Sequence, residues 1–402
     1  MHSQEHIWPM MGAKLSTCEE EPGHFGDQAC VERAPSQNAE FEAARLTIRL
    51  GAIERNFRVC QRLSGPAAVA AVVKADAYGL GMREVARRLA DAGCDTFFVA
   101  RLQEALALRP LAPEARIFVL DGAPAQTAAT LIAHRLTPAL NSLAEIAAWS
   151  AAAKEMRRPL DAAIHVDTGM NRLGLPREEL LTLAAEADKR LDGVRVALIM
   201  SHLACAEDPN SPMNGEQLMR FKAALQMLPA APASLSSTGG ILLGKNFHFD
   251  IVRPGLGLYG GNPQDGPNPF STAVRLTSRI LQLRRIEKGE TAGYGATFRA
   301  RRPTTLATVA LGYADGLFRT LSNRGFAAIA GRRAPFAGRV SMDLVTLDVT
   351  DIPPAALCVG AEAEFIGDTI SPDEIAAAAG TAPYEILTSL ARRAGRHYET
   401  GA

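Results

Sequence analysis

Residues 71–81 read AVVKADAYGLG, an apolar run that ends in Lys74 and leads into a turn with two glycines. A run that is apolar on both faces is typical of a buried parallel strand, so we expect Lys74 to leave the core at the carboxyl end of such a strand. Burial lowers the pKa of a lysine toward the neutral amine, the form that reacts with a carbonyl group to give a Schiff base. The two glycines and Tyr78 favour close approach of a bound group. The plainer alternative is a lysine whose charged end merely reaches solvent.

The chain around this run alternates short β-rich runs with segments of helical period. We predict strands at residues 67–74, 96–100, 116–120, 136–140, 160–167, 194–202, 233–237 and 248–253. Helical segments include residues 82–92, 102–109, 142–156, 177–187 and 214–228. Eight such units favour a (β/α)8 barrel over a doubly wound sheet, which more often has about five to seven strands. We therefore assign residues 45–272 to a barrel.

The rhythm changes after about residue 273, where short strands separated by Gly, Pro and Asp replace the helices. These strands are predicted at residues 275–286, 305–311, 327–329, 344–349 and 361–366, with a helix at 372–379. We expect a mostly β second domain over residues 273–402. The apolar run at residues 46–50 is a candidate to pair with it.

Composition narrows the class of protein. The chain has 402 residues, of which 47% are hydrophobic, and 43 basic residues balance 43 acidic ones. A balanced charge gives no general attraction to nucleic acid or membranes. The six cysteines, scattered without metal-ligand spacing, suggest free thiols in a reducing compartment. We read no secretory signal and no membrane span, and expect a soluble, cytoplasmic protein.

Residues 1–44 are polar and rich in turn-forming residues, so we expect a loosely ordered extension. Its three histidines, His2, His6 and His24, are interpreted as solvated surface rather than as a metal site. We predict no metal site in the chain.

Polar residues recur at the carboxyl ends of the predicted barrel strands, where barrel enzymes build their active sites. His165 and Asp167 end the fifth strand, with Arg172 in the loop beyond; His202 ends the sixth, Ser236 and Ser237 the seventh, and Arg253 and Gly255 the eighth. The runs STGG (237–240) and RPGLG (253–257) supply hydroxyls and glycine amides suited to a phosphate. An ordinary turn is the alternative for the first run taken alone.

Several of these segments resemble one family. The stretches HVDTGMNRLG (165–174), VRPGLGLYG (252–260), GYADG (312–316), GYG (293–295), GRVSMD (338–343) and YEI (384–386), together with residues 71–81, are similar to the alanine racemases. The resemblance runs in the same order over about residues 45–398. It implies a pyridoxal 5'-phosphate enzyme with a barrel and a β domain, acting as a homodimer with shared active sites.

The resemblance also implies roles for individual residues. Lys74 matches the Schiff-base lysine and one proton-transfer base, and Tyr294 the second base, contributed by the partner subunit. His202 matches the histidine that hydrogen-bonds this tyrosine, and Arg253 the arginine at the pyridine nitrogen. The phosphate-binding positions correspond to Tyr78, Ser237, Gly255, Leu256 and Tyr384, and the substrate-binding positions to Arg172, Tyr313, Met342 and Asp343.

Two departures from the family pattern concern the site. Many members have a carbamylated lysine where this chain has His165, so we expect a bound anion or a nearby carboxylate to orient Arg172 instead. Residues 392–396, RRAGR, differ from the usual pattern, and we expect them only to reshape a turn.

The function expected from these observations is interconversion of L- and D-alanine, which supplies D-alanine for peptidoglycan. Racemisation needs a proton removed from one face of the α-carbon and one delivered to the other, which a Lys and Tyr pair provides. The alternatives are an amino-acid racemase of broader specificity, a pyridoxal-phosphate-binding protein without catalysis, and a decarboxylase on a related architecture. The β segment that carries Tyr294 argues against the second, because such carriers typically consist of the barrel alone.

Overall fold

The computed structural model describes residues 43–390 and 393–401. Except for its last two residues, the extension predicted at residues 1–44 lies outside these ranges, and so do its three histidines and Arg392.

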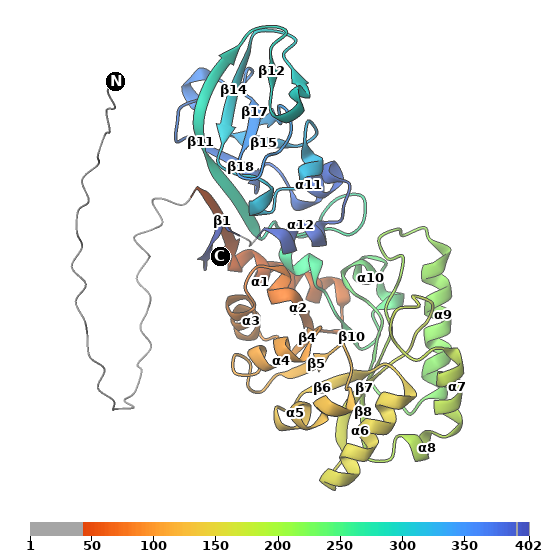
Figure 1. Ribbon diagram of the computed structural model, residues 1–402. Helices are drawn as coiled ribbons and strands as arrows, with labels where there is room; N and C mark the ends of the chain where they lie inside the picture. The colour runs from red at the N-terminus through yellow and green to blue at the C-terminus, as the bar shows by residue number, and fades with distance from the viewer. Residues whose placement is uncertain (1–42, 391–392, 402) are drawn as a thin grey trace, which may run out of the picture. The chain divides into compact units, whose positions relative to one another are not determined.

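Within residues 43–390, parallel strands lie inside a layer of helices (Figure 1), and their pairing closes them into a ring. Strands β3 to β9 lie side by side in chain order. Strand β10 closes the ring, because it pairs in parallel with β2 while Asp250 N donates a hydrogen bond to the Ala233 carbonyl, in β9, at 3.1 Å. The predicted (β/α)8 barrel is confirmed. Its first strand consists of two segments, β2 (Ala68–Val69) and β3 (Ala71–Val72), which are interrupted at Ala70. The other seven strands are β4 (Thr96–Val99), β5 (Arg116–Val119), β6 (Thr137–Leu140), β7 (Leu160–His165), β8 (Val194–Met200), β9 (Ala233–Ser234) and β10 (Ile251–Val252).

Several of these strands end earlier than predicted. The residues predicted at their carboxyl ends lie instead in the loops that build the site. Strand β7 ends at His165, β8 at Met200 and β9 at Ser234. The polar groups that follow find partners outside the strand ladder; the Ser236 hydroxyl, for example, donates to the Phe247 carbonyl at 2.7 Å. Serine and histidine thus leave the sheet at its carboxyl edge.

The barrel helices follow the predicted periodicity with two kinds of exception. The helix predicted at 177–187 breaks at Glu186, whose φ of −123° is not helical. Helices α5 and α10 are not among those predicted, since α5 is short and α10 contains two glycines, which are poor helix formers. The helices are α3 (Met82–Asp91), α4 (Leu102–Leu108), α5 (Ala128–Ala133), α6 (Leu143–Met156), α7 (Arg177–Ala185), α8 (Ala187–Arg190), α9 (Pro212–Met227) and α10 (Thr238–Leu242).

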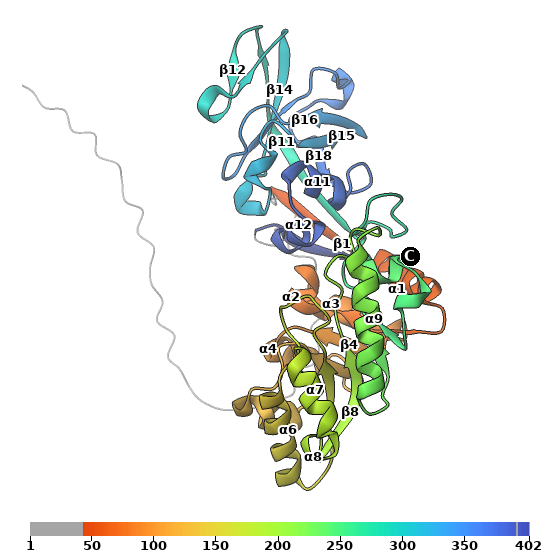
Figure 2. The same ribbon diagram turned by 90° about the vertical axis from the view of Figure 1, so that its right-hand side faces the viewer.

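Residues from 274 onward form a second, mostly β domain, in which the long strand β11 is central (Figures 1 and 2). It pairs antiparallel with β14 and β18. The helix predicted at 372–379 is present with those bounds. The elements are β11 (Val274–Ile286), β12 (Thr291–Ala292), β13 (Phe298–Arg299), β14 (Thr304–Val309), β15 (Phe326–Ile329), β16 (Arg332–Pro335), β17 (Val345–Asp348), β18 (Glu362–Ile366), α11 (Pro372–Ala379), α12 (Pro383–Ser389) and β19 (Gly395–Glu399).

Strand β1 (Ala44–Arg49) belongs to the sheet of this second domain although it precedes the barrel in the chain. Ala44 pairs with Ser278 of β11 in antiparallel register, and Arg45 pairs with Gly395 of β19 in parallel register. Helix α1 (Leu50–Ser64) then leads into the barrel. The described chain therefore leaves the second sheet, completes the barrel and returns to the same sheet.

Among the described residues, no helix has the length and apolar character of a membrane span. The same residues contain no group of three or more His, Cys, Asp or Glu side chains arranged to hold a metal ion. Four described cysteines, Cys60, Cys94, Cys205 and Cys358, are free thiols.

Candidate functional site

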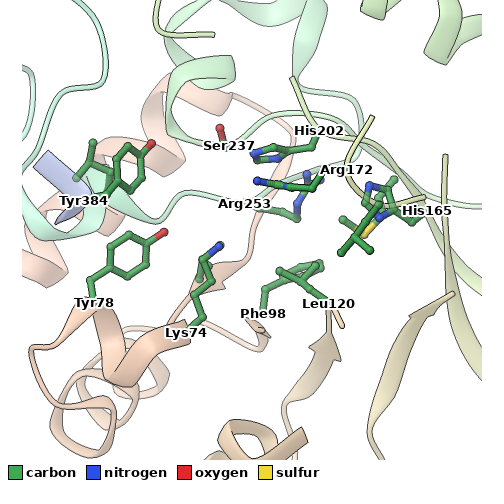
Figure 3. Close-up of a pocket in the computed structure, with 14 residues that line it drawn as sticks. Lys74, Tyr78, Phe98, Leu120, His165, Arg172, His202, Ser237, Arg253 and Tyr384 are labelled. Carbon is green, nitrogen blue, oxygen red and sulfur yellow. The ribbon is translucent and has the colours of Figure 1, made fainter. Parts of the chain in front are cut away.

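A cavity of about 300 Å³ lies at the carboxyl ends of the barrel strands, and side chains from several strand ends point into it (Figure 3). Its volume is at the lower end of the range for small-molecule sites. The lining residues are Val72, Lys74, Tyr78, Phe98, Leu120, His165, Arg172, Leu173, Met200, His202, Ser237, Arg253, Leu256 and Tyr384.

The structure brings the predicted barrel residues together with Tyr384 of the second domain, and leaves four other predicted residues of that domain apart from them. Those that line the cavity are Lys74, Tyr78, Arg172, His202, Ser237, Arg253, Leu256 and Tyr384. Gly255 lies beside them, since a Cβ there would be 2.1 Å from the Tyr78 hydroxyl oxygen. Tyr294, Tyr313, Met342 and Asp343 do not line the cavity of their own chain. Tyr294 is 71% exposed.

Lys74 begins α2 (Lys74–Tyr78), a single turn that winds in the left-handed sense. Ala75, Asp76 and Ala77 have φ of 52°, 54° and 53°, and Tyr78 has φ of 58°. This conformation costs about 1–2 kcal/mol for each residue that carries a side chain, so four in succession are strained. The predicted glycine turn therefore begins earlier, at residues other than glycine. Strained backbone of this kind clusters at functional sites.

The Lys74 amine points into the cavity (Figure 3). Burial lowers its pKa below the usual value, and the positive charges of Arg172 and Arg253 lower it further, although Glu104 and Asp121 act in the opposite direction. More of the amine is therefore neutral at a given pH than for a solvated lysine. A neutral amine is the form that attacks a carbonyl carbon.

Arg253 is buried at the centre of the site and fixed by backbone and hydroxyl partners. Its Nη1 donates to the Ser234 hydroxyl, and its Nη2 donates to the Ser201 carbonyl at 2.7 Å. Burial lowers the pKa of this guanidinium to about 10, so it stays charged at neutral pH. Its Nε makes no hydrogen bond to a described residue, which leaves a donor for a ligand in the cavity.

Two neutral histidines face these arginines. Burial lowers the pKa of His165 to about 4, with Arg253 adding to the effect. Its Nδ1 lies 2.8 Å from Asn141 Oδ1, a hydrogen bond in which the imidazole donates. Burial also lowers the pKa of His202 well below its usual value. The positive charges of Arg253, Arg172 and Lys74 lower it further. Both imidazoles therefore serve as neutral hydrogen-bonding groups at pH 7.

One end of the cavity has the chemistry of an anion site. Ser237, Tyr78 and Tyr384 supply hydroxyl groups there, and the rings of the two tyrosines are 6.1 Å apart. Burial raises the pKa of Tyr78, and it raises that of Tyr384 to about 12, so both phenols keep their protons at pH 7. The Thr238 hydroxyl accepts hydrogen bonds from Gly255 N and Gly257 N, which orders the glycine loop beside Leu256.

Arg172 makes no ion pair with any carboxylate in the described parts of the chain. The expectation that a nearby carboxylate orients it is therefore wrong within one chain. The reason is local: the Asp167 carboxylate caps its own loop, accepting hydrogen bonds from Gly169 N and Met170 N at 2.8 and 2.9 Å. A bound anion, the other expectation, stays a prediction.

The predicted substrate residues of the β domain lie on two loops that are bonded to each other. Tyr313 N donates to the Ser341 carbonyl and Ala314 N to the Met342 carbonyl, both at 3.0 Å. Arg393 links the same loops through their carboxylates, reaching Asp343 Oδ1 with Nη1 at 2.7 Å. The sequence pattern at residues 392–396 predicts only a reshaped turn and gives no sign of this arginine's contacts. Because the partners are 50 residues apart in the chain, no local pattern signals the contact.

Comparison with known proteins agrees with this architecture. The family models named "Alanine racemase, N-terminal domain" and "Alanine racemase, C-terminal domain" match residues 48–263 and 273–398. A catabolic alanine racemase of Agrobacterium fabrum is 48% identical over 364 residues, which is 90% of this chain and 94% of the relative. An alanine racemase of Methylobacterium nodulans is 48% identical over 89% of this chain and 97% of its own length.

Solved structures show the same relationship. An alanine racemase from Bartonella henselae, described with covalently bound pyridoxal phosphate, has a TM-score of 0.85 and 39% identity, covering 89% of this chain and 99% of its own. A biosynthetic alanine racemase from Pseudomonas aeruginosa has a TM-score of 0.84 and 36% identity over the same shares. These matches place the chain among enzymes named for racemising an amino acid. The chain belongs to the alanine racemase family, as the sequence motifs predicted.

Proposed function

We propose that this protein is a pyridoxal 5'-phosphate-dependent racemase that interconverts L- and D-alanine. The observation that carries the proposal is a lysine of lowered pKa in a cavity whose far end has the chemistry of a phosphate site. The site fits the cofactor on its own geometry. Lys74 offers a nucleophilic amine for an aldehyde, Tyr78, Ser237 and Tyr384 offer hydroxyl donors, and Gly255 occupies a place where a Cβ would reach the Tyr78 hydroxyl.

The chain's own residues then have defined tasks. When bound, pyridoxal 5'-phosphate withdraws electrons from the α-carbon of an attached amino acid and so acidifies its proton. Lys74 Nζ accepts or donates that proton on one face, and Tyr294 Oη of the partner subunit does so on the other. Arg253, as a hydrogen-bond donor, would hold the cofactor's ring nitrogen. Since a guanidinium does not release its proton, it would leave that nitrogen unprotonated, which would weaken electron withdrawal and limit side reactions.

We infer a role for the partner subunit because Tyr294, the proposed second base, does not line the cavity of its own chain. Tyr294 is exposed and lies outside the cavity of its own chain. Tyr313 and Met342 are also more than one third exposed. We assign this surface of the β domain to the entrance of the other subunit's cavity, so that two chains complete two sites.

An assay with purified protein tests the proposal. We expect a visible absorption band of bound cofactor, conversion of D-alanine to L-alanine, and loss of both in Lys74→Ala. The Tyr294→Phe variant should keep the band and lose about 10²- to 10⁴-fold in kcat, the usual contribution of a proton-transfer group. A band without turnover would support a carrier instead, and release of carbon dioxide a decarboxylase. Comparable turnover of serine or lysine would support broader specificity.

We further propose that the enzyme works in the cytoplasm and supplies D-alanine for peptidoglycan. The proposal rests on the reaction, because D-alanine is its product. Deleting the gene in the source bacterium should make growth depend on added D-alanine. Growth without D-alanine, combined with failure to grow on alanine as carbon source, would instead assign the enzyme to alanine breakdown.

A further inference from the structure

The strained turn that follows Lys74 is held by side chains from two other parts of the chain. Ala75 to Tyr78 all have φ between 52° and 58°, and such residues keep this conformation only where their surroundings impose it. Hydrogen bonds inside the turn, such as Gly79 N to the Ala75 carbonyl at 2.7 Å, accompany the conformation. Contacts from elsewhere in the chain must therefore impose it.

Glu104 supplies the first outside contact. One of its carboxylate oxygens accepts a hydrogen bond from Ala75 N at 2.7 Å. The other accepts hydrogen bonds from Ala100 N at 2.8 Å and Arg101 N at 3.0 Å, at the start of α4. The same carboxylate thus fixes its own helix and the residue next to Lys74. Hydrogen bonds to a charged acceptor are stronger than those between neutral groups.

Strand β19 supplies the second contact. Arg396 Nη1 donates to Asp76 Oδ2 at 2.7 Å, while Asp76 Oδ1 accepts from Met82 N at 2.7 Å. Tyr398 on the same strand donates to the Leu80 carbonyl at 3.1 Å. A Cβ on Gly81 would lie only 1.9 Å from the Tyr398 hydroxyl, so the strand lies directly against the turn.

We propose that Glu104 and the Asp76–Arg396 pair are positioning residues, which hold the left-handed turn so that the Lys74 amine is presented to the cofactor. None of the three lines the cavity, so each acts through Lys74 rather than on a ligand. The inference rests on the proposed function for the identity of the cofactor. The contacts that hold the turn do not depend on it.

The test compares the full-length protein with Glu104→Gln, Asp76→Asn, Arg396→Gln and the double variant of the ion pair. Glutamine keeps one acceptor oxygen, so it can cap α4 or bind Ala75 N, but it cannot serve all three amides. Hydrogen–deuterium exchange of the segment 75–81 measures how firmly the turn is held. Cofactor dissociation and the visible circular dichroism of the bound cofactor measure its presentation, and general loss of stability alone does not shift the dichroism.

We expect Glu104→Gln to speed exchange of the Ala75 amide and to weaken cofactor binding by about 10- to 100-fold, as for a lost bond to a charged group. Asp76→Asn and Arg396→Gln should each change the exchange rate of the turn and the cofactor affinity by up to about fivefold. The double variant should change them by no more than either single variant does. Arg195→Gln is the matched control. It removes the ion pair with Asp161 at the amino ends of β7 and β8, the opposite end of the strands from the cavity, and should leave the turn unaffected.

Two outcomes separate the inference from the proposed function. If the unaltered protein binds no pyridoxal 5'-phosphate, the proposed function fails. Hydrogen–deuterium exchange of residues 75–81 then still tests whether Glu104 and the Asp76–Arg396 pair hold the turn. If the unaltered protein binds the cofactor and Glu104→Gln leaves exchange, affinity and dichroism unchanged, the positioning role is overturned. The same holds if Arg195→Gln alters the turn as strongly as Glu104→Gln does.

Discussion

Arg393 donates hydrogen bonds from Nε and Nη2 to both carboxylate oxygens of Asp315, at 2.8 and 2.9 Å. Asp315 is buried and also accepts a hydrogen bond from Gly312 N at 2.8 Å. The third contact of the arginine, to Asp343, joins this loop to the neighbouring one. Arg393 therefore sets the spacing between Tyr313 and Asp343, two of the residues predicted to bind substrate.

Replacing Arg393 should impair substrate binding more than cofactor binding. Arg393→Gln removes the guanidinium group that binds Asp315 and Asp343. A resulting displacement of about 1 Å at the entrance is expected to lower kcat/KM by about 10- to 100-fold, mainly through KM. Steady-state kinetics with each alanine enantiomer and a cofactor titration measure the two effects. Equal losses of cofactor affinity and kcat/KM would contradict the assignment.

The shared site predicts complementation between two inactive variants. In a mixed dimer of Lys74→Ala and Tyr294→Phe chains, one of the two sites receives an intact lysine and an intact tyrosine. Random pairing makes half of the dimers mixed, so co-expression should restore about one quarter of the original activity. Each variant expressed alone is the control. No recovery on mixing would show that Tyr294 serves its own chain or has no part in the reaction.

Gly255 should be intolerant of alanine because the added methyl group has no room. A Cβ there would lie 2.1 Å from the Tyr78 hydroxyl oxygen. Gly255→Ala is expected to displace the Tyr78 phenol and weaken cofactor binding by at least about tenfold, the loss of roughly one hydrogen bond to a charged group. Gly215→Ala in α9, where no atom lies within 4 Å of the added carbon, is the control. It should keep the affinity and stabilise the helix by about 1 kcal/mol.

The buried His165 should make stability depend on pH on the acid side. Its pKa falls from 6.5 to about 4 on folding, so the unfolded chain binds more protons between these values and stability decreases as the pH drops through them. The full effect corresponds to about 3 kcal/mol. Urea unfolding at pH 7 and at pH 5 should show a smaller difference for His165→Gln than for the unaltered protein. An equal difference in His165→Gln and in the unaltered protein would refute the role of burial.

The barrel and most of its site could be predicted because both depend on local patterns. Apolar runs mark the strands, and the residues just after them, such as Lys74, His202 and Arg253, meet at one rim by the geometry of parallel strands. The groups that hold the site could not be predicted in this way. Glu104 contacts a residue 29 positions away, and Arg396 one 320 positions away. The sequence does not predict the left-handed turn, because none of residues 75–78 is glycine, the usual signal for positive φ.

Strand β1 lies between β11 and β19, so the first described strand acquires its neighbours only when far later parts of the chain are available. During synthesis on the ribosome, the barrel can therefore fold before either edge of β1 has a strand to pair with. Arg396 and Tyr398 reach the lysine-bearing turn later still, when β19 emerges. A nascent chain halted before residue 395 would therefore have its lysine-bearing turn held by Glu104 alone, beside a sheet that lacks one strand.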